Sequence, residues 1–215
     1  MKENLKSIFD NVLEGNKDEV ISGVQEALDN NISVQSILND ALIAAMKEVG
    51  LRFEAGDFYV PEMLIAARSM QAGLKILKPR FDQSGLKSKG TIVMGTVQGD
   101  LHEIGKNLVC MMLEGAGFDV IDLGTDVSPE TFASAVRQYN PQVVGMSALL
   151  TTTMAKMHST IEAIEDINMR SNVKIIIGGA PVTEQFAKEI SADGYAPDAS
   201  RTVQLVENLL GPKSN

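Results

Sequence analysis

The sequence predicts an α/β protein in two parts: an N-terminal four-helix bundle over residues 1–81 and a five-stranded parallel sheet over residues 90–215. In the first part, apolar residues recur three and four positions apart, which is the spacing of amphipathic helices. In the second part, short β-branched runs alternate with helical patterns, as in a parallel sheet with right-handed crossovers. Residues 82–89 are polar, contain glycine and show no periodicity. We therefore expect the linker there.

The bundle begins with a short helix near residues 3–14. A second helix is expected after Asn16, which stands three positions before Glu19, as a helix N-cap stands before its capping acid. That helix ends near Asn30.

The third helix has the most regular pattern in the chain. Ser33 is its cap candidate, and Gly50 and Gly56 loosen its end. Its apolar stripe consists of Val34, Ile37, Leu38, Ala41, Leu42, Ala45, Met46 and Val49. Pro61 suits the first turn of a fourth helix, which ends before Pro79.

The second part is expected to form a flavodoxin/Rossmann-like sheet. Its strands are predicted at Thr91–Val97, Asp119–Leu123, Val143–Met146, Val173–Ile177 and Gly194–Ala196. Its helices are predicted at 103–116, 129–139, 153–169, 182–191 and 200–210. Polar residues and glycines follow these strands, and the carboxyl ends of parallel strands share one edge, where ligands bind. The sequence therefore predicts a ligand site at that edge.

Composition restricts the class of partner. A net charge of −9 argues against a nucleic-acid surface. The single cysteine, Cys110, rules out an internal disulfide and fits a reducing compartment. The charged N-terminus lacks a long apolar run, so we expect no signal peptide, no membrane span and a cytoplasmic location. Proteins or small molecules are the expected partners.

The stretch Asp100–Gly105 lies at a strand-to-helix corner and contains His102. A metal ligand, an acid/base catalyst and a structural histidine all remain open. As a ligand, one imidazole nitrogen would bind metal and the other would donate to Asp100, while a macrocycle supplied the remaining ligands. A Ser147–His102–Asp100 triad is disfavoured because no Gly-x-Ser-x-Gly elbow occurs, and the familiar nucleotide motifs do not fit.

A resemblance narrows these alternatives. Asp100-x-His102-x-x-Gly105, Ser147-x-Leu149 and Gly178-Gly179, taken in order, resemble the three-part signature of cobalamin-binding domains. The helical half resembles the small domain that precedes the cobalamin domain in methionine synthase. The same two domains occur in the corrinoid proteins of methylamine, methanol and O-demethylase methyltransferase systems.

The resemblance implies a helical cap, a cobalamin-binding domain and specific residue roles. The cofactor would be cobalamin, as methylcobalamin or cob(I)alamin, or a related corrinoid. His102 would replace the lower base on cobalt, Asp100 would be its hydrogen-bonded partner, and Thr153 would continue the relay. The implied cofactor-binding residues are Gly99, Asp100, His102, Gly105, Ser147, Leu149, Thr151, Thr153, Gly178, Gly179 and Tyr195, with Tyr59, Met63 and Leu64 of the cap over the upper face.

The resemblance also implies a methyl carrier in one-carbon metabolism that is not catalytic alone. A substrate-specific methyltransferase would supply the methyl group from a methylamine, methanol, glycine betaine or a phenyl methyl ether. A second methyltransferase would pass it to a tetrahydrofolate-like pterin or a thiol coenzyme, and a reductive activase would restore the cofactor. The alternative is a cobalamin-binding storage or sensor protein without a methyl-transfer role.

Overall fold

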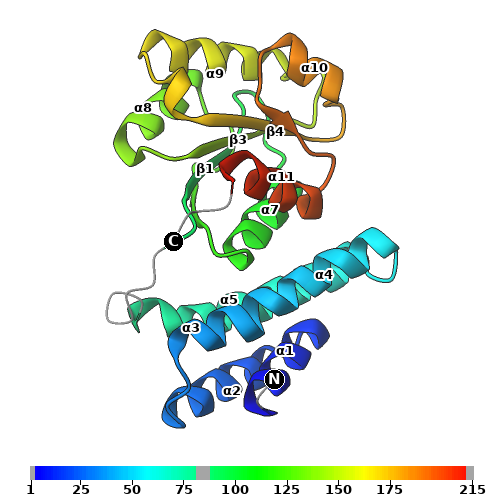
Figure 1. Ribbon diagram of the computed structural model, residues 1–215. Helices are drawn as coiled ribbons and strands as arrows, with labels where there is room; N and C mark the ends of the chain where they lie inside the picture. Colours follow the sequence, from blue (N-terminus) through cyan, green and yellow to red (C-terminus); the bar gives the residue numbers. More distant parts are fainter. Residues whose placement is uncertain (1–2, 81–87, 212–215) are drawn as a thin grey trace. The chain divides into compact units, whose positions relative to one another are not determined.

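The computed structural model describes residues 3–80 and 88–211. The chain divides into two compact units, one formed by Met1–Ser88 with Glu114–Gly117, the other by Lys89–Leu113 with Phe118–Asn215 (Figure 1). The expected linker at residues 82–89 falls mostly on residues 82–87, which lie outside the described residues. Within the described ranges, no helix has the length and apolar character needed to cross a membrane.

The helical unit confirms the predicted N-terminal helices. Its elements are α1 (Glu3–Glu14), α2 (Lys17–Asp29), α3 (Val34–Ser36), η1 (Ile37–Ile43), α4 (Ala44–Ala55), α5 (Val60–Leu77) and the short turn η2 (Lys78–Arg80). Elements α3, η1 and α4 follow one another without a break. The apolar stripes of these helices form the core of the unit, where Ile8, Val20, Leu42 and Met70 have no exposed surface.

The expected regular third helix is wrong in one respect. Its central residues Ile37–Ile43 form a π-helix rather than an α-helix. The stripe is compatible with this form, because its apolar pairs recur every four residues from Ile37 to Val49. An α-helix has about 3.6 residues per turn, so a repeat of four drifts around its surface. A π-turn closes i→i+5 bonds and holds more residues, which keeps the stripe on the buried side.

Both predicted N-cap positions are confirmed, but only one of the two side chains makes the capping hydrogen bond. Asn16 is the N-cap residue of α2, yet its side chain donates to Asn11 Oδ1 at 3.0 Å and to Glu14 Oε2 at 2.8 Å and makes no hydrogen bond to the helix that it precedes. The Ser33 hydroxyl caps the next helix, since it accepts from the backbone N–H of Ser36 at 3.1 Å. Asparagine and serine both suit an N-cap. At Asn16, neighbouring residues of the preceding helix engage the side chain instead.

The second unit confirms the predicted parallel sheet. Its strands are β1 (Thr91–Thr96), β2 (Asp119–Asp122), β3 (Val143–Ser147), β4 (Lys174–Gly178) and β5 (Gly194–Tyr195). All neighbours pair in parallel, in the order β2-β1-β3-β4-β5. The strand order reverses at β1, which lies between β2 and β3. Open α/β sheets bind ligands in the crevice at such a point.

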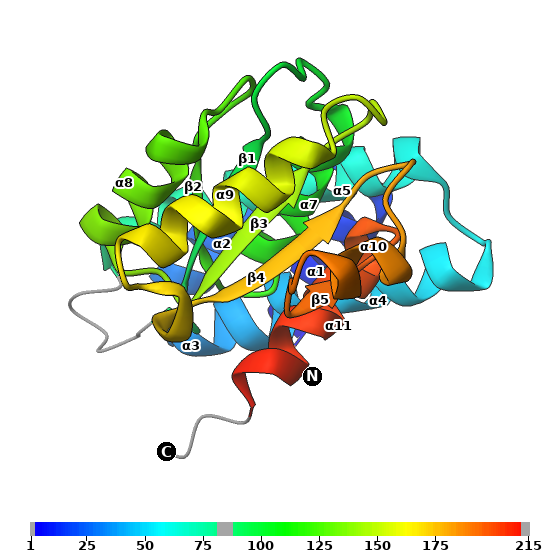
Figure 2. The same cartoon turned by 90° about the horizontal axis from the view of Figure 1, so that it is seen from above.

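Helices cover both faces of the sheet. They are α7 (Ile104–Gly115), α8 (Pro129–Tyr139), α9 (Ala155–Asp166), α10 (Glu184–Glu189) and α11 (Ala199–Leu210), with the turn η3 (Arg170–Asn172) after α9. Helices α8, α9 and α10 lie on one face, and α7 and α11 lie on the other (Figures 1 and 2). One buried cluster joins Val93, Val144 and Ile175 of the strands to Phe132 and Ile161 of the covering helices.

Candidate functional site

The loops after β1 and β3 lie side by side, because β1 and β3 pair in register from Ile92 to Thr96. The pairing continues one step further, since the Val97 N–H donates to the Ser147 carbonyl at 3.0 Å. The chain then turns sharply at Gly99, whose φ of +84° lies in the left-handed region. The Asp100 N–H closes this turn on the Val97 carbonyl at 3.1 Å. Asp100 is thereby directed inward, toward the second loop.

The Asp100 carboxylate is the centre of the site. Its side chain is fully buried. One oxygen accepts from His102, from the backbone N–H at 3.1 Å and from Nδ1 at 2.8 Å. The other accepts from the N–H groups of Leu149 at 2.7 Å and Leu150 at 3.2 Å, and from the Thr153 hydroxyl at 2.9 Å. This carboxylate therefore joins the two loops.

These hydrogen bonds fix the charge of Asp100. Burial by itself raises the pKa of its carboxyl, but hydrogen bonds to the ionised form outweigh burial. The largest of them come from the backbone N–H groups of His102 and Leu149, followed by the side chains of His102 and Thr153. As a result, the pKa of Asp100 lies well below its usual range. Asp100 is an anion at every physiological pH.

The Asp100 anion determines the tautomer of His102. An ionised carboxylate only accepts hydrogen bonds, so the proton of a neutral imidazole lies on Nδ1. The lone pair is then on Nε2, which has no hydrogen-bond partner among the described residues. The His102 side chain is 52% exposed, although the carboxylate that orients it is not exposed at all. A buried anion thus orients a half-exposed imidazole, whose Nε2 carries the lone pair that can bind a metal.

The Thr153 hydroxyl has two acceptors and one proton. Its oxygen lies 2.9 Å from Asp100 Oδ2 and 2.8 Å from the Leu150 carbonyl. A hydroxyl donates one hydrogen bond at a time, so it serves either acceptor by rotating. Thr153 can therefore change how strongly the Asp100 carboxylate is held.

The paired glycines after β4 are required by the chain itself. A Cβ on Gly179, whose φ is +127°, would lie 1.9 Å from the Ala148 carbonyl oxygen. A Cβ on Gly178 would lie 3.0 Å from the Ala196 carbonyl oxygen. These glycines let the loops after β3, β4 and β5 approach closely. Gly105 differs, because a Cβ there would meet nothing within 4 Å. The chain itself makes no steric demand for glycine beside His102.

Comparison with known proteins agrees with this geometry. Models of the B12 binding domain match residues 90–204 and, in a second model, residues 5–78. Dimethylamine corrinoid protein 1 of Methanosarcina acetivorans is 40% identical over 97% of this chain and 98% of its own length. The chain belongs to the B12-binding corrinoid proteins.

Two solved structures share the fold of this corrinoid protein over nearly its whole length. A cobalamin-binding protein from Desulfitobacterium hafniense is 31% identical, covers 96% of this chain and 98% of its own, and has a TM-score of 0.79. The methanol:cobalamin methyltransferase complex MtaBC of Methanosarcina barkeri is 28% identical, covers 100% of this chain and 82% of the matched chain, and has a TM-score of 0.87.

The residues at the sheet edge fit a corrinoid. A corrin would bring most of the ligands of its own cobalt, so a single side-chain nitrogen of the protein would be enough to hold that metal. Nε2 of His102, on a side chain that is 52% exposed, is suited to that role. The flanking side chains of Leu101 and Ile104 are 72% and 75% exposed, which leaves an apolar surface for a ligand to cover. Among residues 3–80 and 88–211, no group of three or more His, Cys, Asp and Glu side chains is placed to hold a metal.

The other predicted residues of the corrinoid protein's sheet domain occupy varied positions. Leu149 contributes its backbone N–H to Asp100, while its side chain is 43% exposed. Ser147 is half-buried at the end of β3, and Thr151 is exposed in the following loop. Tyr195 on β5 pairs with Ile177 of β4, and its side chain packs against the sheet core. Contact of Ser147, Thr151 and Tyr195 with the cofactor stays a prediction.

The three predicted cap residues also differ in exposure. Tyr59 is 68% exposed and precedes α5, where its backbone N–H donates to Glu62 Oε2 at 2.9 Å. Leu64 is half-buried, and Met63 has no exposed surface. Their place over the upper face of a corrin stays a prediction.

Sequence reasoning missed three residues, Lys106, Asp122 and Asp126, whose ion pair and hydrogen bonds support the His102 loop. One signal for Lys106 is present in the sequence. This lysine stands four positions before Cys110 and seven before Leu113, both buried residues of α7. A lysine on the apolar stripe of a helix needs a buried partner.

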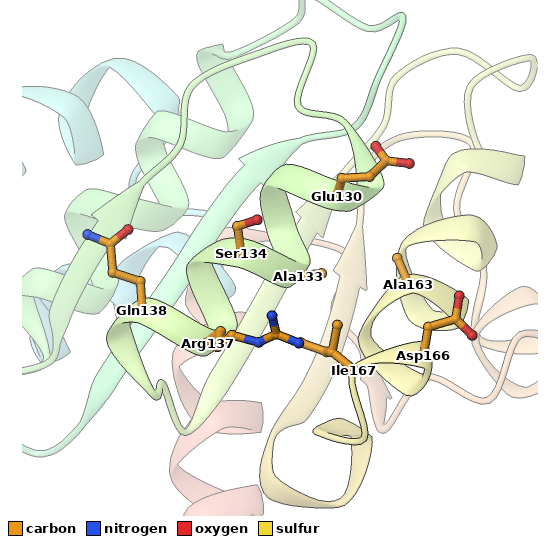
Figure 3. A pocket seen from close by; sticks show the side chains of 8 residues that line it. All are labelled: Glu130, Ala133, Ser134, Arg137, Gln138, Ala163, Asp166 and Ile167. Carbon is orange, nitrogen blue, oxygen red and sulfur yellow. The ribbon is translucent and has the colours of Figure 1, made fainter.

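A groove between α8 and α9 lies apart from the cofactor edge (Figure 3). Its volume is about 500 Å³. Figure 3 shows Arg137 extending from α8 toward α9, with Glu130 and Gln138 near opposite ends of the helix. The lining residues are Glu130, Ala133, Ser134, Arg137, Gln138, Ala163, Asp166 and Ile167. They include none of the predicted cofactor-binding residues, so this groove is a separate feature of the helical layer.

Proposed function

We propose that this corrinoid protein carries a methyl group between two methyltransferases. The bound corrinoid supplies a cobalt centre that accepts and gives up the methyl group. The chain supplies binding, orientation and control of the axial ligand. The observation that carries the proposal is the pair of His102 and Asp100, in which a buried anion holds an exposed imidazole with Nε2 directed outward.

His102 is the proposed axial ligand of cobalt. Asp100 keeps the proton on Nδ1 and increases the electron density on Nε2, as carboxylates do for metal-bound histidines. Thr153 adjusts this pair through its shared hydroxyl proton.

The remaining predicted residues form the proposed pocket. Gly105 leaves space beside His102 for the cofactor. The proposed cofactor contacts in the domain at residues 90–215 are Gly99, Ser147, Leu149, Thr151, Gly178, Gly179 and Tyr195. Tyr59, Met63 and Leu64 of the cap at residues 1–81 are proposed to cover the opposite face of the corrin.

The proposed partners follow from the relatives. A relative is named for dimethylamine, and a matched structure is the methanol:cobalamin methyltransferase complex MtaBC. We propose a substrate-specific methyltransferase for a methylamine or methanol as donor partner. We further propose a second methyltransferase with a pterin or thiol acceptor, a reductive activase and a cytoplasmic location.

Reconstitution with hydroxocobalamin tests the ligand. After chemical reduction to the paramagnetic Co(II) form, we expect electron paramagnetic resonance to show nitrogen hyperfine splitting from His102. His102→Ala is expected to lose that splitting. His158→Ala is the matched control, because His158 is the only other histidine and its side chain is also 52% exposed. Failure to bind hydroxocobalamin, or loss of the splitting in the control, contradicts the assignment.

Transfer of an isotopically labelled methyl group tests the carrier role. The loaded protein is incubated with a dimethylamine-specific or methanol-specific methyltransferase and its labelled substrate. We expect label to appear on the protein with one of these enzymes and to leave it when a second methyltransferase and its acceptor are added. Binding of cobalamin without any transfer would instead support a storage or sensor role.

A further inference from the structure

The loop between β2 and α8 contacts Gly99 and Asp100, the residues that lead into His102. This bracing loop, Leu123–Val127, connects β2 to α8. Its residue Asp126 accepts from the Gly99 N–H through Oδ1 at 2.7 Å. The Asp126 N–H in turn donates to the Asp100 carbonyl at 3.0 Å. One residue therefore binds both Gly99 and Asp100, immediately before His102.

The backbone of Asp126 is adapted to this contact. Its φ of 54° lies in the left-handed region. That conformation costs an ordinary residue about 1–2 kcal/mol, and only glycine, asparagine and aspartate adopt it readily. The two hydrogen bonds to Gly99 and Asp100 offset this cost. The conformation orients both the carboxylate and the N–H of Asp126 toward the His102 loop.

An ion pair that is buried on its lysine side holds the other end of the bracing loop. The Lys106 side chain on α7 is 0% exposed, and its ammonium binds the Asp122 carboxylate at the end of β2, whose side chain is 38% exposed. The same ammonium donates to Asn107 Oδ1 at 2.7 Å. Removing the Asp122 carboxylate would leave the buried ammonium without its counter-charge, so this contact resists opening. Lys106 thereby fixes the first turn of α7 to β2.

The Lys106–Asp122 ion pair connects to His102 through a continuous chain of hydrogen bonds. Asp122 Oδ1 accepts from the Gly124 N–H at 2.9 Å, and the Gly124 carbonyl accepts from the Thr96 N–H at 3.0 Å. The buried Thr96 hydroxyl then donates to the His102 carbonyl at 2.9 Å. The backbone of His102 is therefore held through Thr96, and that of Gly99 and Asp100 through Asp126.

We propose that Asp126 and Lys106 are positioning residues that set the place of the His102 imidazole through the bracing loop. The proposal rests on the proposed function in one respect, namely that His102 binds cobalt. A ligand must be held to within about 0.5 Å to bind a metal productively, and such precision needs supporting contacts. Asp126 and Lys106 supply such contacts without touching the imidazole of His102 itself.

Two substitutions of Asp126 separate its carboxylate from its backbone conformation. Asp126→Gly keeps the left-handed backbone without strain but removes the acceptor. Asp126→Asn keeps both the conformation and Oδ1, so it is the matched control. In the full-length protein without cofactor, we expect the Gly99 amide to exchange its hydrogen about tenfold faster in Asp126→Gly, as for the loss of one charged hydrogen bond. Asp126→Asn is expected to match the wild type.

Reconstitution with hydroxocobalamin extends the test to His102. After reduction to Co(II), we expect Asp126→Gly to bind cobalamin with a smaller fraction showing nitrogen hyperfine splitting, while Asp126→Asn retains the wild-type fraction. The urea midpoints of both variants are measured in parallel. A loss of splitting at an unchanged midpoint separates positioning from general destabilisation.

Lys106→Met tests the second support, with Lys174→Met as control. Lys174 also pairs with an aspartate, Asp193, at 3.3 Å, but its side chain is 48% exposed. We expect a reduced fraction of histidine-ligated Co(II) in Lys106→Met alone. If Lys106→Met does not fold, the Asp126 pair decides the proposal by itself.

The outcomes distinguish the two proposals. Unchanged Gly99 exchange in Asp126→Gly overturns the brace, whatever cobalamin does. Faster exchange with full retention of the nitrogen splitting overturns the positioning role. If the wild type itself lacks the splitting, the proposed function fails, whereas the exchange result still decides whether Asp126 holds the loop.

Discussion

The loop that carries His102 and the outer face of α9 that carries His158 contain the two histidines of the chain. Both side chains are 52% exposed, and both lie near a carboxylate. At His102 the carboxylate is Asp100, 2.8 Å from Nδ1 and 0% exposed. At His158 it is Glu162, 3.9 Å from Nδ1 and 59% exposed. The two regions therefore differ in the carboxylate rather than in the imidazole.

This difference teaches how a ligand site is distinguished from a solvated surface. An exposed carboxylate one helical turn away interacts weakly, because water competes for both groups. A buried carboxylate with every acceptor position engaged cannot move, so it fixes the tautomer and the orientation of the ring. The burial of Asp100 is what makes His102 a candidate ligand.

The largest expected effect comes from removing the Asp100 carboxylate, with removal of the Glu162 carboxylate as the matched control. Asp100→Ala leaves the N–H groups of His102, Leu149 and Leu150 without their acceptor, and we expect a loss of about 3 kcal/mol or more in the free energy of unfolding. Glu162→Ala is expected to change it by less than about 0.5 kcal/mol. Urea denaturation followed by circular dichroism measures both. Similar losses in the two variants would contradict the conclusion that burial distinguishes Asp100 from Glu162.

The pH dependence of stability sharpens the same contrast. The pKa of Asp100 is depressed in the folded protein relative to its ordinary value of 3.8. Its contribution to stability is therefore fully present above pH 3.8 and is lost as the pH falls toward the lower folded-state pKa. We expect the unfolding free energies of wild type and Asp100→Asn to converge as the pH falls through this window. A constant difference across it would show that the Asp100 charge is not the source.

Two buried threonines provide a test of intermediate size. Thr153 donates to Asp100, whereas the Thr160 hydroxyl on α9 donates to the Lys156 carbonyl at 2.8 Å. Substitution of either by valine is expected to cost about 1 kcal/mol of stability. Only Thr153→Val should alter the absorption spectrum of bound hydroxocobalamin. An equal spectral change in Thr160→Val would argue against a specific link through Asp100.

The smallest effect on the free protein is expected at the apolar flank of His102. Ile104 is 75% exposed, so Ile104→Ala should change the free energy of unfolding by less than about 0.5 kcal/mol. If a corrin covers part of this side chain, the affinity for hydroxocobalamin should fall about fivefold, which corresponds to the loss of roughly one buried methylene group. Tyr139→Ala, at an apolar residue 40% exposed at the end of α8, is the control and should leave affinity unchanged.

The sequence by itself determined the elements of the fold and the local part of the site. The strand β3 was expected at Val143–Met146, and in the structure it ends only one residue later, at Ser147. The prediction came this close because β-branched runs and turn residues act on the backbone locally. The contact of Asp100 with His102 also follows from local geometry, since the two residues are two positions apart. The resemblance, rather than the spacing, indicated Thr153.

The tertiary structure alone decided the long-range contacts and the form of one helix. Asp126 reaches Gly99 across 27 positions, and Thr153 reaches Asp100 across 53. These two contacts depend on the register in which β1 pairs with β2 and β3, and no single segment of the sequence encodes that register. The repeat of four after Ser33 was visible in the sequence, but the π-helix that satisfies it depends on the helices packed against it. Local patterns fix which residues form an element; the register of the packed elements fixes which side chains meet at His102.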